Sequence, residues 1–83
     1  MKQVLKYGGT WCGPCKLYAP TFDKVASETP NAQFESIDVD SGDPRIVEHG
    51  IRNVPTTVVI DENGSVKKQS GVMSVDQLKA FIG

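Results

Sequence analysis

The apolar residues in the first half of the chain predict a strand, a helix and a second strand. Residues 4–7 form a short β-prone run that ends at Gly8-Gly9. From residue 13 to about residue 29, apolar side chains recur at helical spacing, which predicts a helix with one buried stripe. The members of that stripe are Tyr18, Phe22, Val25 and Ala26. Residues 33–38, which include two large apolar side chains, predict the second strand.

Two further helices are marked by residues that favour helix ends. Asp43-Pro44 is typical of an N-cap followed by proline at the first helical position, and this short helix is predicted to stop at Gly50. Ser74 and Gln77 have the spacing of a capping box at the start of a C-terminal helix. The apolar face of that helix consists of Val75, Leu78, Phe81 and Ile82.

A hairpin is predicted between these two helices. Residues 56–60 are almost wholly β-branched, which favours a strand. Asn63-Gly64 is a strong hairpin signal, so residues 65–69 are predicted to form the returning strand. Strands and helices therefore alternate, which is typical of an α/β domain. With 83 residues and no linker or repeat, residues 1–83 predict a single domain.

Composition narrows the possible partners and location. Nine basic and ten acidic side chains give a formal net charge of −1, which argues against nucleic-acid or membrane-surface binding. Residues 1–7 lack the apolar core of a secretory signal, and no apolar run approaches the roughly 20 residues of a membrane span. We therefore expect a protein of the reducing cytoplasm, where two closely spaced cysteines indicate catalysis or metal binding.

Cys12 and Cys15 lie at the predicted start of the first helix. A disulfide between them would close too short a loop to stabilise the fold much. A structural zinc site needs four ligands, and His49 is the only histidine, so no metal site is expected. Residues i and i+3 share one face of a helix, within reach of a disulfide. The spacing predicts a redox centre, although the spacing alone leaves an inert pair open.

The position of each cysteine in the helix predicts its role. Cys12 is expected to be exposed at the helix tip, where unpaired backbone N–H groups and the helix dipole stabilise the attacking thiolate. Cys15, one turn further in, is expected to resolve the mixed disulfide. Gly13 would let a partner backbone approach, and Pro14 would stiffen the first turn without losing a hydrogen bond.

Residues 11–16, Trp-Cys-Gly-Pro-Cys-Lys, resemble the active-site motif of the thioredoxin family. The resemblance extends to Pro20, residues 50–56, Gly71 and residues 74–82, and so covers nearly the whole chain. It implies a minimal thioredoxin fold, in which a four-stranded mixed sheet of order 2-1-3-4 is flanked by three helices. Strands 3 and 4 would run antiparallel to the first pair, and strand 2 would be an exposed edge.

The resemblance also implies a surface that binds substrate. In the family, a cis proline lies beside the cysteines and the backbone before it pairs with an extended substrate segment. This implies a cis Val54–Pro55 bond and a substrate contact at Val54. Gly71 matches a family glycine that keeps the groove open. We expect Trp11 to shield the thiol and to contact substrates, with an ordinary core position as the alternative. His49 is expected to be a surface or boundary residue without a catalytic role.

The chain departs from the family pattern in two places. Only eleven residues precede Cys12, so its start resembles glutaredoxins and the small archaeal-type or phage-type thioredoxins. The family's buried aspartate, six residues before the first cysteine, is replaced by Lys6, and the lysine partner of that aspartate by Ser36. Lys6 either extends out to solvent, which we favour, or lies under the redox pair as an active-site supporting residue, where its charge would favour a thiolate.

The resemblance implies a protein-disulfide reductase that acts by thiol–disulfide exchange. It implies a flavin- and NADPH-dependent thioredoxin reductase as electron donor and disulfide-containing proteins as clients. We expect a monomer with no bound cofactor, in which the Cys12–Cys15 disulfide carries the electrons. One alternative is a glutathione-dependent glutaredoxin, which the chain length favours and the Gly13-Pro14 dipeptide disfavours. Another is a binding subunit that uses the same fold without turnover.

Overall fold

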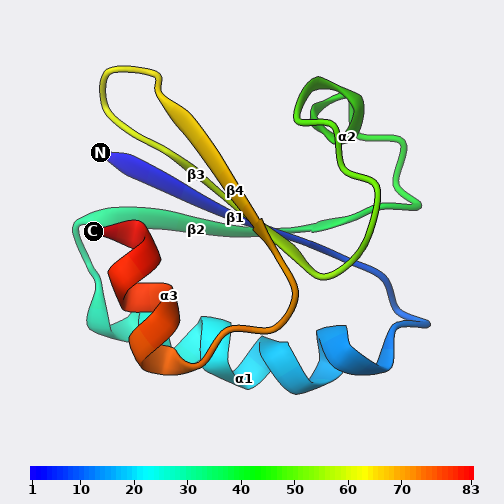
Figure 1. Ribbon diagram of the computed structural model, residues 1–83, viewed down its shortest axis with the longest axis horizontal. Coiled ribbons are helices and arrows are strands. Elements are labelled where there is room, and N and C mark those ends of the chain that lie inside the picture. The colour runs from blue at the N-terminus through cyan, green and yellow to red at the C-terminus, as the bar shows by residue number, and fades with distance from the viewer.

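The computed structural model describes residues 1–83 and contains a four-stranded sheet of order β2-β1-β3-β4 (Figure 1). The strands are β1 (Lys2–Gly8), β2 (Ala32–Asp38), β3 (Thr56–Ile60) and β4 (Val66–Ser70). The helices are α1 (Gly13–Glu28), α2 (Arg45–Glu48) and α3 (Val75–Ile82). These elements confirm the α/β class and the strand order expected from the sequence. None of the helices is both long enough and apolar enough to cross a lipid bilayer.

The strand directions differ in one respect from expectation. β1 pairs parallel with β2 and antiparallel with β3, and β4 pairs antiparallel with β3. β4 therefore runs in the same direction as β1, and the expectation that both later strands oppose the first pair is wrong for β4. The reason is the tight turn at Asn63-Gly64, where Gly64 has a φ of +87° and the Asp61 N–H donates to the Ser65 carbonyl at 2.9 Å. A turn of this kind returns the chain antiparallel to the strand it leaves.

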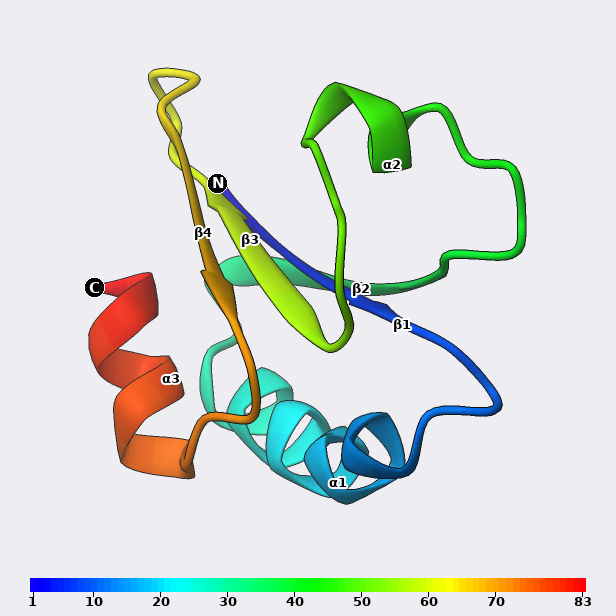
Figure 2. The same cartoon turned by 45° about the vertical axis from the view of Figure 1, so that its right-hand side comes forward.

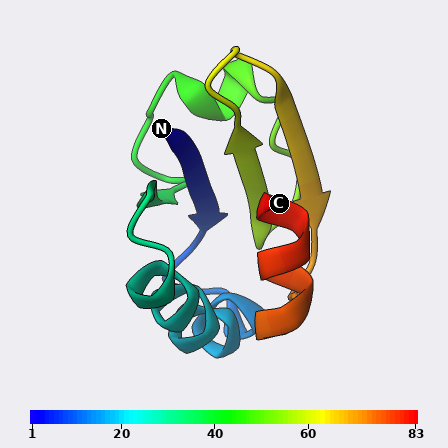
Figure 3. The same cartoon turned by 90° about the vertical axis from the view of Figure 1, so that its left-hand side faces the viewer.

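The sheet separates two apolar clusters. On one face, α1 and α3 cover Val4 and Val59 of the central strands (Figures 2 and 3). On the other face, α2 and the segment after it pack against Leu5 and Val58. Successive residues of a strand point to opposite faces, so neighbours in β1 belong to different clusters. The same alternation places Lys6 on the face that α1 covers.

The helix starts follow the expected capping chemistry. The Ser74 hydroxyl accepts a hydrogen bond from the Gln77 N–H at 3.1 Å, and the Gln77 side chain accepts one from the Ser74 N–H at 2.8 Å. The predicted capping box of α3 is therefore confirmed. α2 begins at Arg45, whose N–H donates to an Asp43 carboxylate oxygen at 2.9 Å. The N-cap of α2 is Pro44, with φ and ψ of −62° and −21°, and not Asp43 as expected, although the Asp43 carboxylate still accepts the first N–H of the helix.

Arg45 ties α2 to the edge strand β2. Its Nη1 and Nη2 donate to the two carboxylate oxygens of Glu35 at 2.9 and 2.8 Å. Its Nε and Nη2 also donate to Asp43 at 3.0 and 2.7 Å. These hydrogen bonds lower the pKa of Glu35 and lower the pKa of Asp43 to about 2. The planar guanidinium suits two carboxylates at once, which lysine would not.

The fold is expected to lose stability in acid partly through Asp43. The pKa of Asp43 is lower in the folded chain than its usual value of 3.8, so its ionised form stabilises the fold above that value. This contribution is lost as the pH falls from about 3.8 towards 2. Urea midpoints measured across this window should fall less steeply for Asp43→Asn than for the unchanged protein. Asp23→Asn, a matched change on α1 away from Arg45, should follow the unchanged protein, and equal slopes for all three would contradict the assignment.

Candidate redox site

A disulfide joins Cys12 to Cys15 at the start of α1, with their Cα atoms 5.2 Å apart. Cys12 is the N-cap residue, and the Cys15 N–H donates to the Cys12 sulfur at 3.1 Å. The Cys12 N–H donates to the Gly9 carbonyl at 3.1 Å, which closes the turn between β1 and α1. The first N–H groups of a helix have no partner within the helix, so the Cys12 sulfur takes the place of a capping oxygen. After reduction, the same contact would stabilise a thiolate at Cys12.

Both cysteines are buried in this disulfide form, with exposed fractions of 5% for Cys12 and 6% for Cys15. The expectation that Cys12 is exposed at the helix tip is therefore wrong for its side chain. The disulfide turns the Cys12 sulfur towards Cys15, which packs against Gly8. A Cβ atom at Gly8 would lie 3.3 Å from the Cys15 sulfur. Gly13 and Pro14, in contrast, are exposed, and nothing lies within 4 Å of a Cβ built on Gly13.

Trp11 lies on the surface, with 65% of its area exposed. Its indole N–H donates to an Asp40 carboxylate oxygen at 2.8 Å, and its ring covers Gly9 so closely that a Cβ there would lie 2.7 Å from Cε2. The alternative of an ordinary core position is therefore wrong. Sequence reasoning missed Asp40 because only the fold brings the loop after β2 to the loop after β1. The one available signal was a carboxylate just beyond the end of the neighbouring parallel strand.

An alanine at Gly9 should displace the Trp11 ring and break its hydrogen bond to Asp40. Trp11 is the only tryptophan, so one indole N–H signal in an NMR spectrum reports on this bond. That signal should move in Gly9→Ala towards its position in Asp40→Ala. It should stay in place in Gly13→Ala, where the added methyl group meets open space. Because the ring is exposed, the free energy of unfolding should change by only about 0.5 kcal/mol. An unmoved signal in Gly9→Ala would refute this contact.

The Val54–Pro55 peptide bond is cis, as the resemblance to the thioredoxin family implied. Pro55 is buried, and its carbonyl accepts a hydrogen bond from the Gly71 N–H at 2.8 Å. β1 and β3 pair Tyr7 with Thr56, and extending that register by one residue places Pro55 opposite Gly8. Since Gly8 packs on Cys15, the fold brings the proline segment to the redox pair. Gly71 has a φ of +93°, a backbone conformation that favours glycine.

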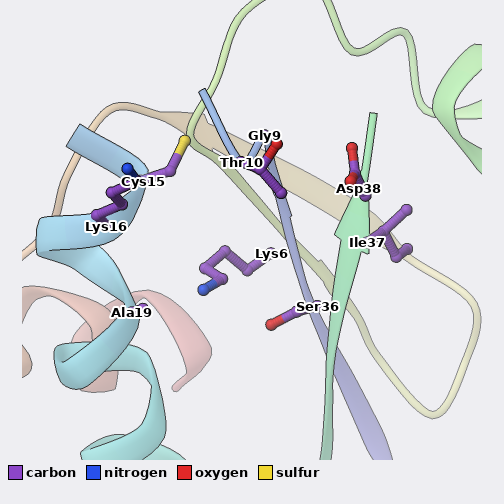
Figure 4. A pocket seen from close by; sticks show the side chains of 10 residues that line it. Lys6, Gly9, Thr10, Cys15, Lys16, Ala19, Ser36, Ile37 and Asp38 are labelled. Carbon is purple, nitrogen blue, oxygen red and sulfur yellow. The ribbon is translucent and has the colours of Figure 1, made fainter. Parts of the chain in front are cut away.

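Lys6 lines a cavity of about 290 Å³ together with Cys15 (Figure 4). The side chain is half-buried, and its Nζ lies 5.2 Å from the centroid of the Phe22 ring. In the sheet, Lys6 pairs with Ser36 on β2 and with Thr57 on β3. The amine therefore does not extend freely into solvent, which was the favoured arrangement, and Lys6 and Cys15 line the same cavity.

His49 lies on the opposite face of the sheet from Lys6. The residue as a whole is intermediate in exposure, but its side chain is only 6% exposed, so the expectation of a surface or boundary position is wrong for the imidazole. Its Nδ1 and the Tyr7 hydroxyl form a hydrogen bond of 2.7 Å. Burial raises the pKa of the Tyr7 phenol. Side chains alternate between the two faces along β1, so Tyr7 and His49 lie on the face of the sheet opposite Lys6 and α1. No group of three or more His, Cys, Asp or Glu side chains is arranged to hold a metal ion.

A family model described as Thioredoxin matches residues 1–83. The chain belongs to the thioredoxin family. A thioredoxin of Mycoplasmoides gallisepticum is 31% identical over 81 residues, which cover 98% of this chain and 81% of that relative. A thioredoxin of Mycoplasma genitalium is 40% identical over 67 residues, which cover 81% of this chain and 65% of that relative. The structure of Fasciola hepatica thioredoxin is similar with a TM-score of 0.87 and 30% identity, over 98% of this chain and 77% of that chain.

Family, fold and disulfide together identify a thiol–disulfide oxidoreductase. The two cysteines of the family motif are joined at the N-terminus of a helix, where a thiolate is favoured. Such a pair can exist as a dithiol or as a disulfide and so can pass two electrons to another disulfide.

Proposed function

We propose that this chain reduces disulfide bonds in proteins by dithiol–disulfide exchange. The observation that carries the proposal is the Cys12–Cys15 disulfide at the start of α1, with the Cys15 N–H directed at the Cys12 sulfur. That N–H and the helix N-terminus make Cys12 the better thiolate and hence the attacking group. Cys15, in the first turn of the helix, is placed to attack Cys12 in turn.

The exchange then runs in two steps that balance in electrons and protons. The Cys12 thiolate attacks a substrate disulfide, a Cys12–substrate bond forms, and the first substrate sulfur leaves as a thiolate that takes up a proton. Cys15 then loses its proton and attacks Cys12, which breaks the mixed disulfide and releases the second substrate thiolate. The protein dithiol is oxidised to a disulfide, and the substrate disulfide is reduced to two thiols.

The substrate is proposed to lie over Trp11, Val54, Pro55 and Gly71. An extended segment would pair with the backbone of Val54, which precedes the buried proline. The exposed ring of Trp11 and the open space at Gly13 flank the buried Cys12 on the side from which a substrate would approach. Aromatic side chains of this kind are enriched where proteins meet.

The oxidised pair must be reduced again, and we propose a flavin- and NADPH-dependent thioredoxin reductase as the donor. The test measures reduction of a disulfide-bonded model protein with NADPH and thioredoxin reductase, or with NADPH, glutathione and glutathione reductase. Turnover only with the first donor supports the proposal. Turnover only with glutathione would instead identify a glutaredoxin-like reductase, and full biological activity of a Cys12→Ser/Cys15→Ser variant would indicate a binding subunit.

The cell location, the assembly state and the cofactor requirement are part of the same proposal. We propose a cytoplasmic monomer that needs no bound cofactor, because the cysteine pair itself carries the electrons. Trapping the thiols with an alkylating agent in intact cells should find the pair largely reduced. A largely oxidised pair would place the protein in an oxidising compartment.

A further inference from the structure

A row of polar residues crosses the sheet on the face that α1 covers. Ser36, Lys6 and Thr57 are paired neighbours on β2, β1 and β3. Apolar residues of the main cluster, such as Val4 and Val59, lie two positions away on the same face. The Thr57 hydroxyl is hydrogen-bonded to the buried hydroxyl of Tyr18 on α1 at 2.8 Å. The layer between sheet and helix is therefore apolar except at the level of Lys6.

The Lys6 amine has no carboxylate partner. It takes part in none of the five ion pairs of the chain. Its nearest defined contact is the Phe22 ring, whose face attracts a cation and keeps the amine between β1 and α1. A half-buried ammonium ion without an anion is poorly compensated in the oxidised protein. Its charge is available to any anion that forms in the same cavity.

The residues that line the cavity indicate which cysteine thiolate could form near Lys6. Cys15 lines it and Cys12 does not (Figure 4). The charged groups around it are Lys6 from β1, Lys16 from α1 and Asp38 from β2. Lys16 is exposed and its charge is largely screened by water, whereas Asp38 would oppose a thiolate. Lys6 is the half-buried cation that lines the same cavity as Cys15.

We propose that Lys6 is a positioning residue for the resolving step, in which its ammonium ion stabilises the Cys15 thiolate. This inference rests on the proposed dithiol–disulfide exchange. Cys15 gives its proton to solvent, its thiolate attacks the Cys12 sulfur to form the Cys12–Cys15 bond, and the Cys12–substrate bond breaks. The substrate thiolate that leaves takes up a proton. Lys6 keeps its own protons throughout and acts only through its charge, which offsets the negative charge on the Cys15 sulfur.

The direct test is the thiol titration of Cys15 in a Cys12→Ser background, where Cys15 is the only thiol. The thiolate is followed by its absorbance near 240 nm as the pH is raised. Lys6→Met should raise the pKa of Cys15, so that the thiolate present at pH 7 falls about three- to tenfold. Lys6→Arg, which keeps the charge, should restore most of it. Lys24→Met, a matched change on α1 away from the cavity, should leave the titration unchanged.

The kinetic test follows release of substrate from the mixed disulfide in the protein with both cysteines. Lys6→Met should slow this step about three- to tenfold at pH 7 and less at a pH where Cys15 is fully ionised. Lys6→Gln is a second variant if the methionine disturbs folding. Unchanged titration in both uncharged variants would overturn the role of Lys6. The titration uses no substrate, so this outcome differs from failure of the proposed function, which would appear as absent turnover in the unchanged protein.

Discussion

Serine in place of Cys12 is expected to reduce turnover to the uncatalysed background. Cys12 holds the N-cap position, where its sulfur accepts the Cys15 N–H, and we propose it as the thiolate that begins the exchange. A hydroxyl group is a far weaker nucleophile at neutral pH and forms no disulfide. The measurement is reduction of a disulfide-bonded model protein with an excess of electron donor.

Serine in place of Cys15 should have a different result, because the first step remains possible. This variant should attack the substrate once and stop at the mixed disulfide, since no second sulfur is left to release it. Mass spectrometry should find about one substrate per protein chain, linked through Cys12. The Cys12→Ser variant is the matched control and should capture almost none. Capture by Cys12→Ser in preference to Cys15→Ser would reverse the assigned roles.

Alanine in place of Leu78 is expected to lower the free energy of unfolding by about 2–5 kcal/mol. Leu78 is fully buried in the cluster that joins α3 to α1 and the sheet. Removal of its side chain leaves a cavity that close-packed neighbours fill only partly. Small domains are stabilised by only about 5–15 kcal/mol, so this single change should remove a large share of the total. Urea unfolding followed by circular dichroism measures the difference.

Leu17 provides the matched control for this prediction. It is also a leucine within a helix, but 76% of its area is exposed. Leu17→Ala removes the same atoms and changes helix propensity by the same small amount, without creating a cavity. Its free energy of unfolding should stay within about 0.5 kcal/mol of the unchanged protein. Equal losses at the two positions would show that burial in this cluster is not what stabilises α3.

Local chemistry made most of the elements predictable. The buried stripe predicted α1, the Ser74 and Gln77 spacing predicted the start of α3, and Asn63-Gly64 predicted the hairpin. Each of these signals acts over a few residues, through helical periodicity, capping or turn geometry. The resemblance to the family implied the sheet order and the cis bond at Pro55, neither of which short-range chemistry determines.

What could not be predicted depends on residues far apart in the chain. The Trp11 indole forms its hydrogen bond to Asp40 only because β1 and β2 end side by side. The direction of β4 relative to β1 combines two pairings, the hairpin with β3 and the long-range pairing of β3 with β1. His49 and Tyr7 form a hydrogen bond although they are 42 positions apart in the sequence, and a local pattern cannot predict such a contact.

For the redox pair too, local sequence determines some features and long-range packing determines others. The sequence by itself determined that Cys12 and Cys15 lie one helical turn apart at a helix start, because spacing and a following proline act locally. Only the tertiary structure decided that both cysteines are buried and that Lys6 shares a cavity with Cys15 and not with Cys12. Burial and electrostatic environment depend on which strands and helices pack together. They are therefore properties of the assembled sheet and helices, and a linear pattern does not contain them.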